Sequence, residues 1–259
     1  IAGVMAVGMP VLAQPIVRKI TGSDDIALGH FCTIGYIVQA GVAKITGDVS
    51  KSTEDFELPQ SFSFLQDTYL SMMVVMIPIY LIPAIAAGPE VVAPYANSVN
   101  YLVYSFLQSI QFVVGVYVLL SGVRLLLAEI VPAFRGIALR IVPNAIPALD
   151  CPVLFPYAPN AVIIGFISTT IGSIIGMFLF PSLGLAMILP GMLTNFFAGG
   201  TAGIFGNAVG GRRGAIIGGI FHGLFITLLP ALLLPLLGKF GFSNVTFSDS
   251  DVISVGLVF

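Results

Sequence analysis

Charged residues are scarce in this sequence. Of its 259 residues only 8% are charged, whereas 57% are hydrophobic, and the mean hydropathy is +1.04. Soluble domains carry roughly 25% charged residues, so a soluble protein of this size would have too few polar groups to cover its surface. The composition therefore indicates a membrane protein. We predict an all-α, polytopic helical bundle, because helices satisfy their own backbone hydrogen bonds in lipid.

The few charges are also nearly balanced, which excludes a second class of function. Ten basic and twelve acidic residues give a net charge of −2, and the sequence has no dense basic run. Nucleic-acid-binding proteins need a basic patch to neutralise phosphates. We therefore expect no nucleic-acid partner for this chain.

Cysteines and recognisable catalytic motifs are scarce as well. The two cysteines, Cys32 and Cys151, lie in apolar segments, which gives no support to a disulfide framework. The glycines of 206–211 are followed by Arg212-Arg213 instead of Lys-Ser/Thr, so they do not form a phosphate-binding P-loop. The sequence shows neither a Ser-His-Asp elbow nor a second catalytic carboxylate. We therefore predict no catalytic residues and no cofactor in this chain.

Apolar runs divide the chain into membrane segments and loops, since a spanning helix needs about 20 apolar residues. We expect a single permease region over residues 1–259, with aqueous loops over 44–63 and Lys239–Asp251. Its apolar runs are Ile1–Val17, Ile26–Ala43, Phe64–Ala87, Tyr101–Val131, Asn160–Phe180 and Gly214–Leu237. No basic stretch precedes the first run, and Val252–Phe259 is apolar but too short to span. We therefore expect further sequence at both ends.

Two apolar stretches differ from regular spans. Five prolines between 143 and 159 rule out a continuous helix there, because each proline removes a backbone donor and clashes with the preceding turn. Irregular backbone at membrane depth is tolerated only inside protein or beside a wet cavity, so we predict that 141–158 is broken or re-entrant. The glycine-rich stretch 198–213 is a candidate for a second re-entrant hairpin. Close helix contacts are predicted where glycines are spaced four apart, at Gly172, Gly176, Gly210, Gly214 and Gly218.

Ionisable residues within apolar segments are the candidate functional residues, because they are costly to place in a membrane. His30 follows Asp24 and Asp25, where a helix start is plausible. Its imidazole either binds a polar solute or is buried and satisfied by a backbone carbonyl. Asp150 lies in the proline-broken stretch, where it either binds a solute, cation or proton, or caps a short helix. His222 lies within a continuous span, so we predict a structural histidine bonded to a neighbouring helix.

Two short clusters of His, Cys and Asp raise the question of a metal ion. Cys32 lies two residues from His30, and Cys151 directly follows Asp150. A site would form only if the two segments met, and adjacent side chains cannot all point inward. We therefore predict no metal site.

A series of motifs runs through the chain in a consistent order. They are Gly29-His30, Gly47-Asp48 through Leu58-Pro59, Gly122-Val123-Arg124 through Ala128-Glu129, Ala133-Phe134-Arg135-Gly136-Ile137, Arg140-Ile141-Val142-Pro143, Ala148-Leu149-Asp150-Cys151, Tyr157-Ala158-Pro159-Asn160-Ala161-Val162, and Asn195-Phe196-Phe197 with Gly210-Gly211-Arg212-Arg213. Together they resemble the ascorbate-type IIC permease family of the bacterial phosphotransferase system. The resemblance covers most of the chain, and the block Asp150–Val162 is its most specific part.

This resemblance implies a function that composition alone does not give. Members of the family import a sugar-like substrate across the bacterial inner membrane through a multi-pass dimer. A soluble IIB partner carries phosphate on a cysteine and passes it directly to the bound substrate. The IIC chain recognises and moves the substrate, L-ascorbate or a related solute, and is not itself phosphorylated.

The resemblance also implies site residues. His30 matches the histidine of a family substrate-binding motif, and Asp150 matches the family's aspartate on a broken segment, which makes 26–43 and 141–180 the substrate-binding core segments. Phe31 stands where the family usually has glutamine; it removes a hydrogen-bonding amide and offers a ring to stack on the substrate. A competing interpretation is a proton- or cation-coupled secondary transporter that uses Asp150 and His30 as coupling sites.

Overall fold

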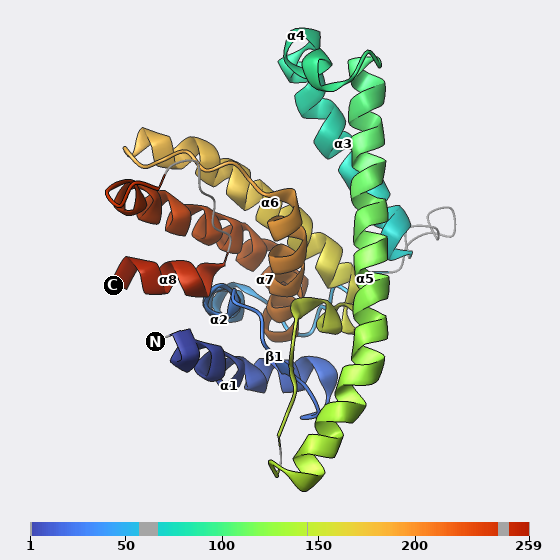
Figure 1. Ribbon diagram of the computed structural model, residues 1–259, viewed down its shortest axis with the longest axis vertical. Helices are drawn as coiled ribbons and strands as arrows, with labels where there is room; N and C mark the ends of the chain where they lie inside the picture. The colour runs from blue at the N-terminus through green and yellow to red at the C-terminus, as the bar shows by residue number, and fades with distance from the viewer. Residues whose placement is uncertain (1, 57–66, 144, 243–248, 259) are drawn as a thin grey trace. The chain divides into compact units, whose positions relative to one another are not determined.

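The chain folds into two compact units, seen here in a computed structural model that describes residues 2–56, 67–143, 145–242 and 249–258. Unit 1 comprises Ile1–Phe56 and Ile130–Phe259, and unit 2 comprises Glu57–Glu129. The prediction that residues 1–259 act as one permease region stays a prediction. The elements of both units are labelled in Figure 1.

Unit 1 contains most of the helices and both short strands. Its elements are α1 (Ala2–Thr21), β1 (Ala27–Leu28), α2 (Thr33–Thr46), β2 (Ala148–Leu149), the 3-10 helix η3 (Cys151–Tyr157), α6 (Pro159–Ser182), α7 (Met192–Gly238) and α8 (Ser250–Val258). Unit 2 contains α3 (Thr68–Ala87), α4 (Pro89–Val92), the 3-10 helix η2 (Ala93–Tyr95) and most of α5 (Tyr101–Arg140), which continues into unit 1.

Four helices among the described residues are long and apolar enough to cross a membrane. They are Tyr69–Ala87 of α3, Tyr101–Arg140, Pro159–Ser182 and Met192–Gly238. The predicted all-α polytopic fold is thereby confirmed. The broken stretch 141–158 is confirmed as well, because its described residues form a two-residue strand and a 3-10 helix in place of a regular α-helix.

Unit 2 is built around two apolar helices with capped starts. The Asp67 carboxylate accepts hydrogen bonds from the backbone N–H groups of Tyr69 and Leu70, each at 2.9 Å, and so satisfies two of the free donors at the start of α3. The predicted run began at Phe64, but residues 64–66 lie outside the described part of the chain. An apolar hollow between α3 and α5 is lined by Leu81, Ile85, Leu102, Val103 and Phe106.

In unit 1, helices α6 and α7 pack with their backbones nearly touching, and Figure 1 shows them side by side. A Cβ added to Gly203 would overlap the carbonyl oxygen of Ala161, and one added to Gly172 would overlap that of Ile220. Small residues allow such approach, and close packing is a main source of helix association in lipid. The helix contacts predicted at the glycines spaced four apart are therefore confirmed.

Helix α7 bends at Gly211, the glycine whose φ of 58° and ψ of −157° interrupt the helical backbone. A Cβ built on Gly206 would lie 2.6 Å from the carbonyl oxygen of Gly214. Eight residues of straight helix would cover about 12 Å, so the chain turns sharply here. The sequence suggested a hairpin over 198–213; the structure shows helix on both sides of a turn at its C-terminal end.

The segment 47–56 packs against this turn. The N–H of Asp48 donates to the carbonyl of Gly210 at 2.8 Å, and the N–H of Arg212 donates to the carbonyl of Lys51 at 2.7 Å. Of the predicted aqueous loop 44–63, residues 44–46 form the last turn of α2, and residues 57–63 lie outside the described part. Segment 47–56 is therefore held in place by its hydrogen bonds to α7.

Glu54 in the same segment fixes the start of α6. Its carboxylate accepts hydrogen bonds from the backbone N–H groups of Asn160, at 3.2 Å, and Ala161, at 2.9 Å. A negative charge is favoured at a helix N-terminus, where backbone donors lack partners within the helix. This long-range cap ties segment 47–56 to the element that follows the candidate site.

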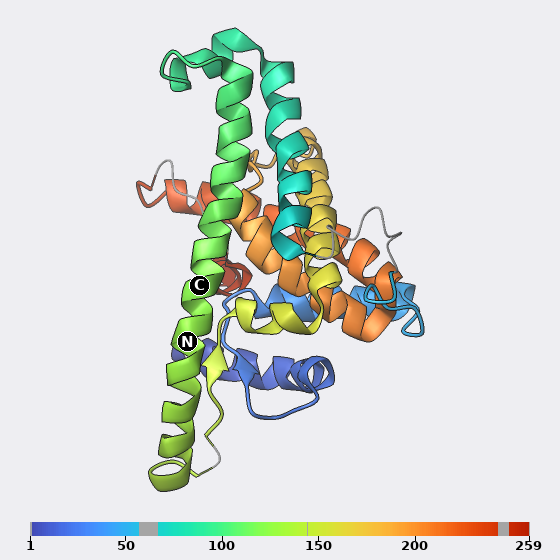
Figure 2. The ribbon, with the colours of Figure 1, turned by 90° about the vertical axis from the view of Figure 1, so that its right-hand side faces the viewer.

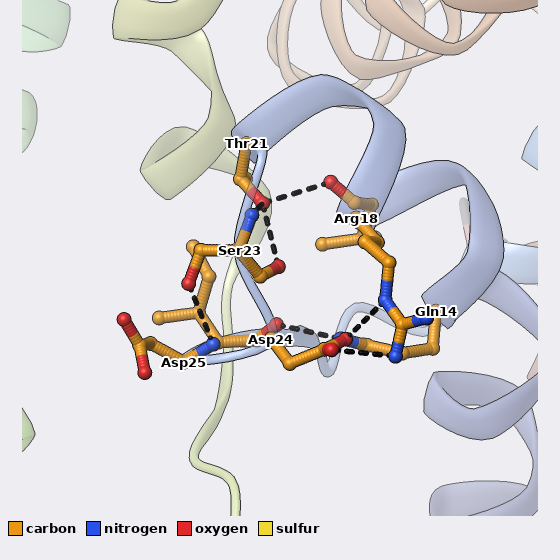
Figure 3. A network of polar contacts seen from close by, with 8 residues as sticks. Gln14, Arg18, Thr21, Ser23, Asp24 and Asp25 are labelled. Carbon is orange, nitrogen blue, oxygen red and sulfur yellow. Dashed lines mark hydrogen bonds and ion pairs between the residues drawn. The ribbon is translucent and has the colours of Figure 1, made fainter.

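The end of α1 is fixed by a local polar network (Figure 3). The side chain of Arg18 donates to Asp24, with Nε 2.6 Å from Oδ1, and Gln14 donates to the backbone carbonyl of Ile26 at 3.1 Å. The hydrogen bond from Arg18 holds the pKa of the Asp24 carboxyl below its usual range. The network directs the chain from α1 into β1.

Candidate functional site

Two short parallel strands bring together segments that are far apart in the sequence. β1 pairs with β2 in the register Ala27 to Ala148 and Leu28 to Leu149. The N–H of Gly29 donates to the carbonyl of Leu149 at 2.7 Å, which extends the pairing to the residue before His30. Figure 2 shows β2 as a yellow-green arrow that leads into η3. The segments 26–43 and 141–180 therefore meet, and His30 and Asp150 leave the strand ends together.

The imidazole of His30 lies between a buried phenol and an exposed carboxylate. Its Nδ1 shares a hydrogen bond with the Tyr36 hydroxyl at 2.6 Å, and its Nε2 lies 3.9 Å from Oδ1 of Asp150. The two alternatives for His30 were a solute ligand and a histidine satisfied by a backbone carbonyl; the observed partner is a side-chain hydroxyl. This bond fixes the ring and leaves Nε2 directed toward Asp150.

Asp150 performs the capping role that the sequence offered as its structural alternative. Its Oδ1 accepts a hydrogen bond from the N–H of Cys151 at 2.7 Å, at the start of η3. The side chain is nevertheless 63% exposed, so the carboxylate can accept further hydrogen bonds. Capping and solute binding are thus compatible at this residue.

Phe31 follows His30 and presents its side chain outward. The side chain is 47% exposed, although its backbone carbonyl is held by the N–H of Asp251 at 2.9 Å. Its ring is thus accessible to solvent, one residue along the chain from His30. His30, Phe31 and Asp150, the three residues predicted from the sequence, therefore all lie at the ends of the paired strands of unit 1.

Ser250 and Asp251, which the sequence analysis did not single out, hold the start of α2 in place. The carboxylate of Asp251 accepts hydrogen bonds from the N–H groups of Thr33, at 3.1 Å, and Ile34, at 2.7 Å, and Ser250 Oγ accepts one from Gly35 at 3.3 Å. Helix α2 has no cap from its own N-cap side chain, so α8 supplies one from more than 200 positions away.

This arrangement corrects two predictions. A helix start near Asp24 and Asp25 is wrong, because strand pairing keeps the chain extended there and α2 begins only at Thr33. The aqueous loop over Lys239–Asp251 is wrong at its end, where Ser250 and Asp251 are buried. Burial also raises the pKa of the Asp251 carboxyl. The only feature of the sequence that pointed to Ser250 and Asp251 was their position before an apolar run, which is a common pattern at helix starts. That pattern does not reveal that they cap a different helix, α2.

His222 on α7 lies behind Tyr36. The two rings stack with centroids 5.7 Å apart and planes 26° apart, and the His222 side chain is fully buried. The predicted burial is confirmed, but the predicted bond to a neighbouring helix is wrong, since neither ring nitrogen has a hydrogen-bond partner among the described residues. Its Nε2 faces Gly35, which has no side chain to pair with it.

Side chains with metal-ligating atoms also converge on His30. One ligand atom each from His30, Asp150 and Cys151 lies within 4.8 Å of the others, and the same holds for His30, Cys32 and Asp249. The expectation that adjacent side chains cannot all point inward is wrong here, because Asp150 and Cys151 both approach the imidazole. The turn from β2 into η3 directs both of them to one side.

Comparison with known proteins gives two findings. The family described as "PTS system sugar-specific permease component" matches residues 1–251. A protein of Mycoplasma pneumoniae (strain ATCC 29342 / M129 / Subtype 1), described as "Ascorbate-specific PTS system EIIC component", is 22% identical over 230 residues, which cover 78% of this chain and 35% of that protein. The chain thus spans about a third of the length of this relative.

Proposed function

Since the chain belongs to the family of sugar-specific permease components of the phosphotransferase system, we propose that it is part of a IIC component that recognises and imports L-ascorbate or a related sugar-like solute. The substrate follows the description of the Mycoplasma relative. The observation that carries the proposal is the juxtaposition of His30 and Asp150 by strands β1 and β2. It joins the two segments that the family resemblance assigns to substrate binding.

In the proposed site, hydrogen bonds from the protein replace the hydrogen bonds that the substrate makes to water. A polyhydroxylated ring loses its hydrogen bonds to water when it enters a transporter and needs replacements of defined geometry. His30 Nε2 and the exposed carboxylate of Asp150 supply these for neighbouring hydroxyls, while the exposed Phe31 ring covers a face of the substrate. Burial of His30, whose side chain is 18% exposed, keeps water from competing on one side.

The proposed reaction needs a second protein. A soluble IIB partner transfers its cysteine-bound phosphoryl group to a hydroxyl of the bound substrate, and the charged product then cannot return across the membrane. This chain orients the substrate and does not carry the phosphoryl group. We assign the complete protein to the bacterial inner membrane as a homodimer.

The test is uptake of labelled L-ascorbate by cells that express the complete protein, with and without its IIB partner, beside a panel of pentoses and hexitols. Uptake that requires IIB and yields a phosphorylated product is the expected result, and the panel identifies the substrate. Uptake that ignores IIB and collapses with the proton gradient would overturn the proposal in favour of a secondary transporter. In that case Asp150 and His30 would be coupling residues.

A further inference from the structure

The group formed by His30, Asp150 and Cys151 has the composition and spacing of an incomplete metal site. We infer that these three residues bind a zinc-class divalent ion, and that the ion competes with the sugar-like solute for His30 and Asp150. The competition rests on the proposed function, whereas the binding of the ion does not.

The spacing of the ligand atoms is close to that of a tetrahedral site. Zinc bonds of about 2.0–2.3 Å place neighbouring ligand atoms about 3.3–3.8 Å apart. The three atoms here lie within 4.8 Å of one another, and His30 Nε2 is 3.9 Å from Oδ1 of Asp150. Side-chain movements of about 1 Å would therefore complete the geometry, without a change in the backbone of either strand.

The backbone and a neighbouring side chain hold the ligands in this position. Strand pairing fixes His30 on one side and Asp150 with Cys151 on the other. Metal-binding histidines usually engage their second ring nitrogen in a hydrogen bond, which orients the ring. Tyr36 does this at Nδ1, with a distance of 2.6 Å, while Nε2 lies 3.9 Å from Oδ1 of Asp150.

The chemistry of the ligands selects the ion. A thiol, an imidazole and one carboxylate suit zinc, whereas magnesium and calcium prefer oxygen ligands throughout. Cys151 is 1% exposed, but Asp150 is 63% exposed, so an ion can enter from the carboxylate side and keep one water ligand. Binding converts the Cys151 thiol into a thiolate and releases its proton to solvent, so affinity should increase as the pH rises.

A second set of ligands, His30 with Cys32 and Asp249, shares the imidazole and provides the internal control. Cys32 Sγ is 3.6 Å from Oδ1 of Asp249. One nitrogen cannot serve two ions, and Nδ1 is engaged by Tyr36. We assign the ion to the set with Cys151, because its three ligands lie within two residues of the ends of the two paired strands, whereas Asp249 lies more than 200 positions from His30.

The experiment titrates the purified complete protein in detergent with ZnCl2 and, as a control, MgCl2, and follows binding by calorimetry. X-ray absorption of the zinc-loaded wild type reports whether sulfur is a ligand. The variants are Cys151→Ser, with Cys151→Ala as a second replacement, and Cys32→Ser as the matched control; thermal stability shows that each variant is folded. A separate titration measures displacement of labelled L-ascorbate by ZnCl2.

We expect zinc to bind the wild type with a sulfur ligand near 2.3 Å, affinity to fall about tenfold or more with either Cys151 replacement, and Cys32→Ser to bind as the wild type does. Unchanged binding in both Cys151 variants, loss of binding in Cys32→Ser, or a zinc shell without sulfur would overturn the assignment. Zinc binding that leaves L-ascorbate bound would overturn the competition. If L-ascorbate fails to bind even without zinc, the proposed function fails, while the zinc titration still decides the metal site.

Discussion

At the scale of single residues, the pairing of His30 with Asp150 leads to a direct prediction. Asp150→Asn removes the carboxylate charge from the proposed site, and His30→Gln removes the imidazole ring. Both variants keep a side chain of similar size. Hydrogen bonds that involve a charged group contribute about 1.5–3 kcal/mol, so L-ascorbate affinity should fall about 10- to 150-fold. Equilibrium binding to the complete protein measures this, with the exposed Glu90→Gln of α4 as the control. Wild-type affinity in both site variants would exclude the pair from the substrate site.

Tyr36 gives a second prediction, because its hydroxyl contacts His30 and no solute. Tyr36→Phe leaves Nδ1 without its 2.6 Å partner, so the imidazole is less well oriented toward Asp150. Loss of a neutral hydrogen bond of about 0.5–1.5 kcal/mol predicts an affinity about two- to tenfold lower. Tyr36→Phe should also weaken substrate binding without the loss of stability that a purely structural role would bring, because the missing contact is to the His30 ring.

Tyr95→Phe is the matched control for that variant, because Tyr95 lies in η2 and is 69% exposed. A purely structural role of Tyr36 would lower thermal stability in Tyr36→Phe and leave the affinity of the folded variant for the substrate unchanged. That result would remove Tyr36 from the group of residues that position His30.

His30 and Asp150 could be identified from the sequence, whereas the residues that position them could not. An ionisable side chain in an apolar segment is conspicuous in any membrane sequence. Tyr36 reads as an ordinary aromatic residue of an apolar helix, and Asp251 contacts Thr33 from 218 positions away. Contacts of that kind depend on tertiary packing, which periodicity along the chain does not encode.

At the scale of elements, the start of α2 depends on a cap from α8. Asp251→Ala would leave the N–H groups of Thr33 and Ile34 without acceptors. Loss of a helix cap costs about 0.5–2 kcal/mol, and the burial of Asp251 favours the upper part of that range. We expect a lower apparent Tm in detergent, together with weaker L-ascorbate binding because α2 carries Tyr36. Glu90→Ala, at an exposed helix position, should change neither.

The contact between α6 and α7 provides a further prediction. Gly203→Ala would drive a methyl group into the carbonyl oxygen of Ala161, and the cost of such overpacking is about 1–3 kcal/mol. Gly115→Ala in α5 is the matched control, since a Cβ there has no neighbour within 4 Å. Thermal stability in detergent should fall in the first variant and not in the second. Equal stability of the two would show that the helices can separate at no cost.

The sequence predicted the helices better than the turns and strands that connect them. Length and apolarity located α3, α5 and α6, because lipid imposes both properties on any crossing segment, but gave only residues 214–237 of α7. The predicted runs Ile1–Val17 and Ile26–Ala43 are not among the described helices that are long and apolar enough to span a membrane. The turn at Gly211 was only partly predicted: a glycine-rich stretch indicates freedom to turn, but not the position at which segment 47–56 packs against it. Strands of two residues, such as β1, are too short to give any alternating pattern.

At the scale of the whole molecule, we predict the membrane orientation from one cluster of four basic residues in unit 1. The hydrogen bonds between segment 47–56 and the turn of α7 place Lys51 beside Arg212, and Lys44 lies in the last turn of α2, just before this segment. Arg213 is exposed at the same turn. Loops rich in Lys and Arg stay on the cytoplasmic side of the membrane. We therefore predict that this end of α2 and the turn of α7 face the cytoplasm.

A single cysteine tests this orientation, because the two native thiols, Cys32 and Cys151, are each only 1% exposed and should react slowly. Ser50→Cys places a thiol on the exposed part of segment 47–56. A membrane-impermeant maleimide should label it in inside-out vesicles and permeabilised cells but not in intact cells, with the unsubstituted protein as the background control. Labelling in intact cells would place this basic end outside. The proposed phosphoryl transfer would then have to occur at the opposite end of unit 1, because a soluble IIB partner reaches the substrate only from the cytoplasm.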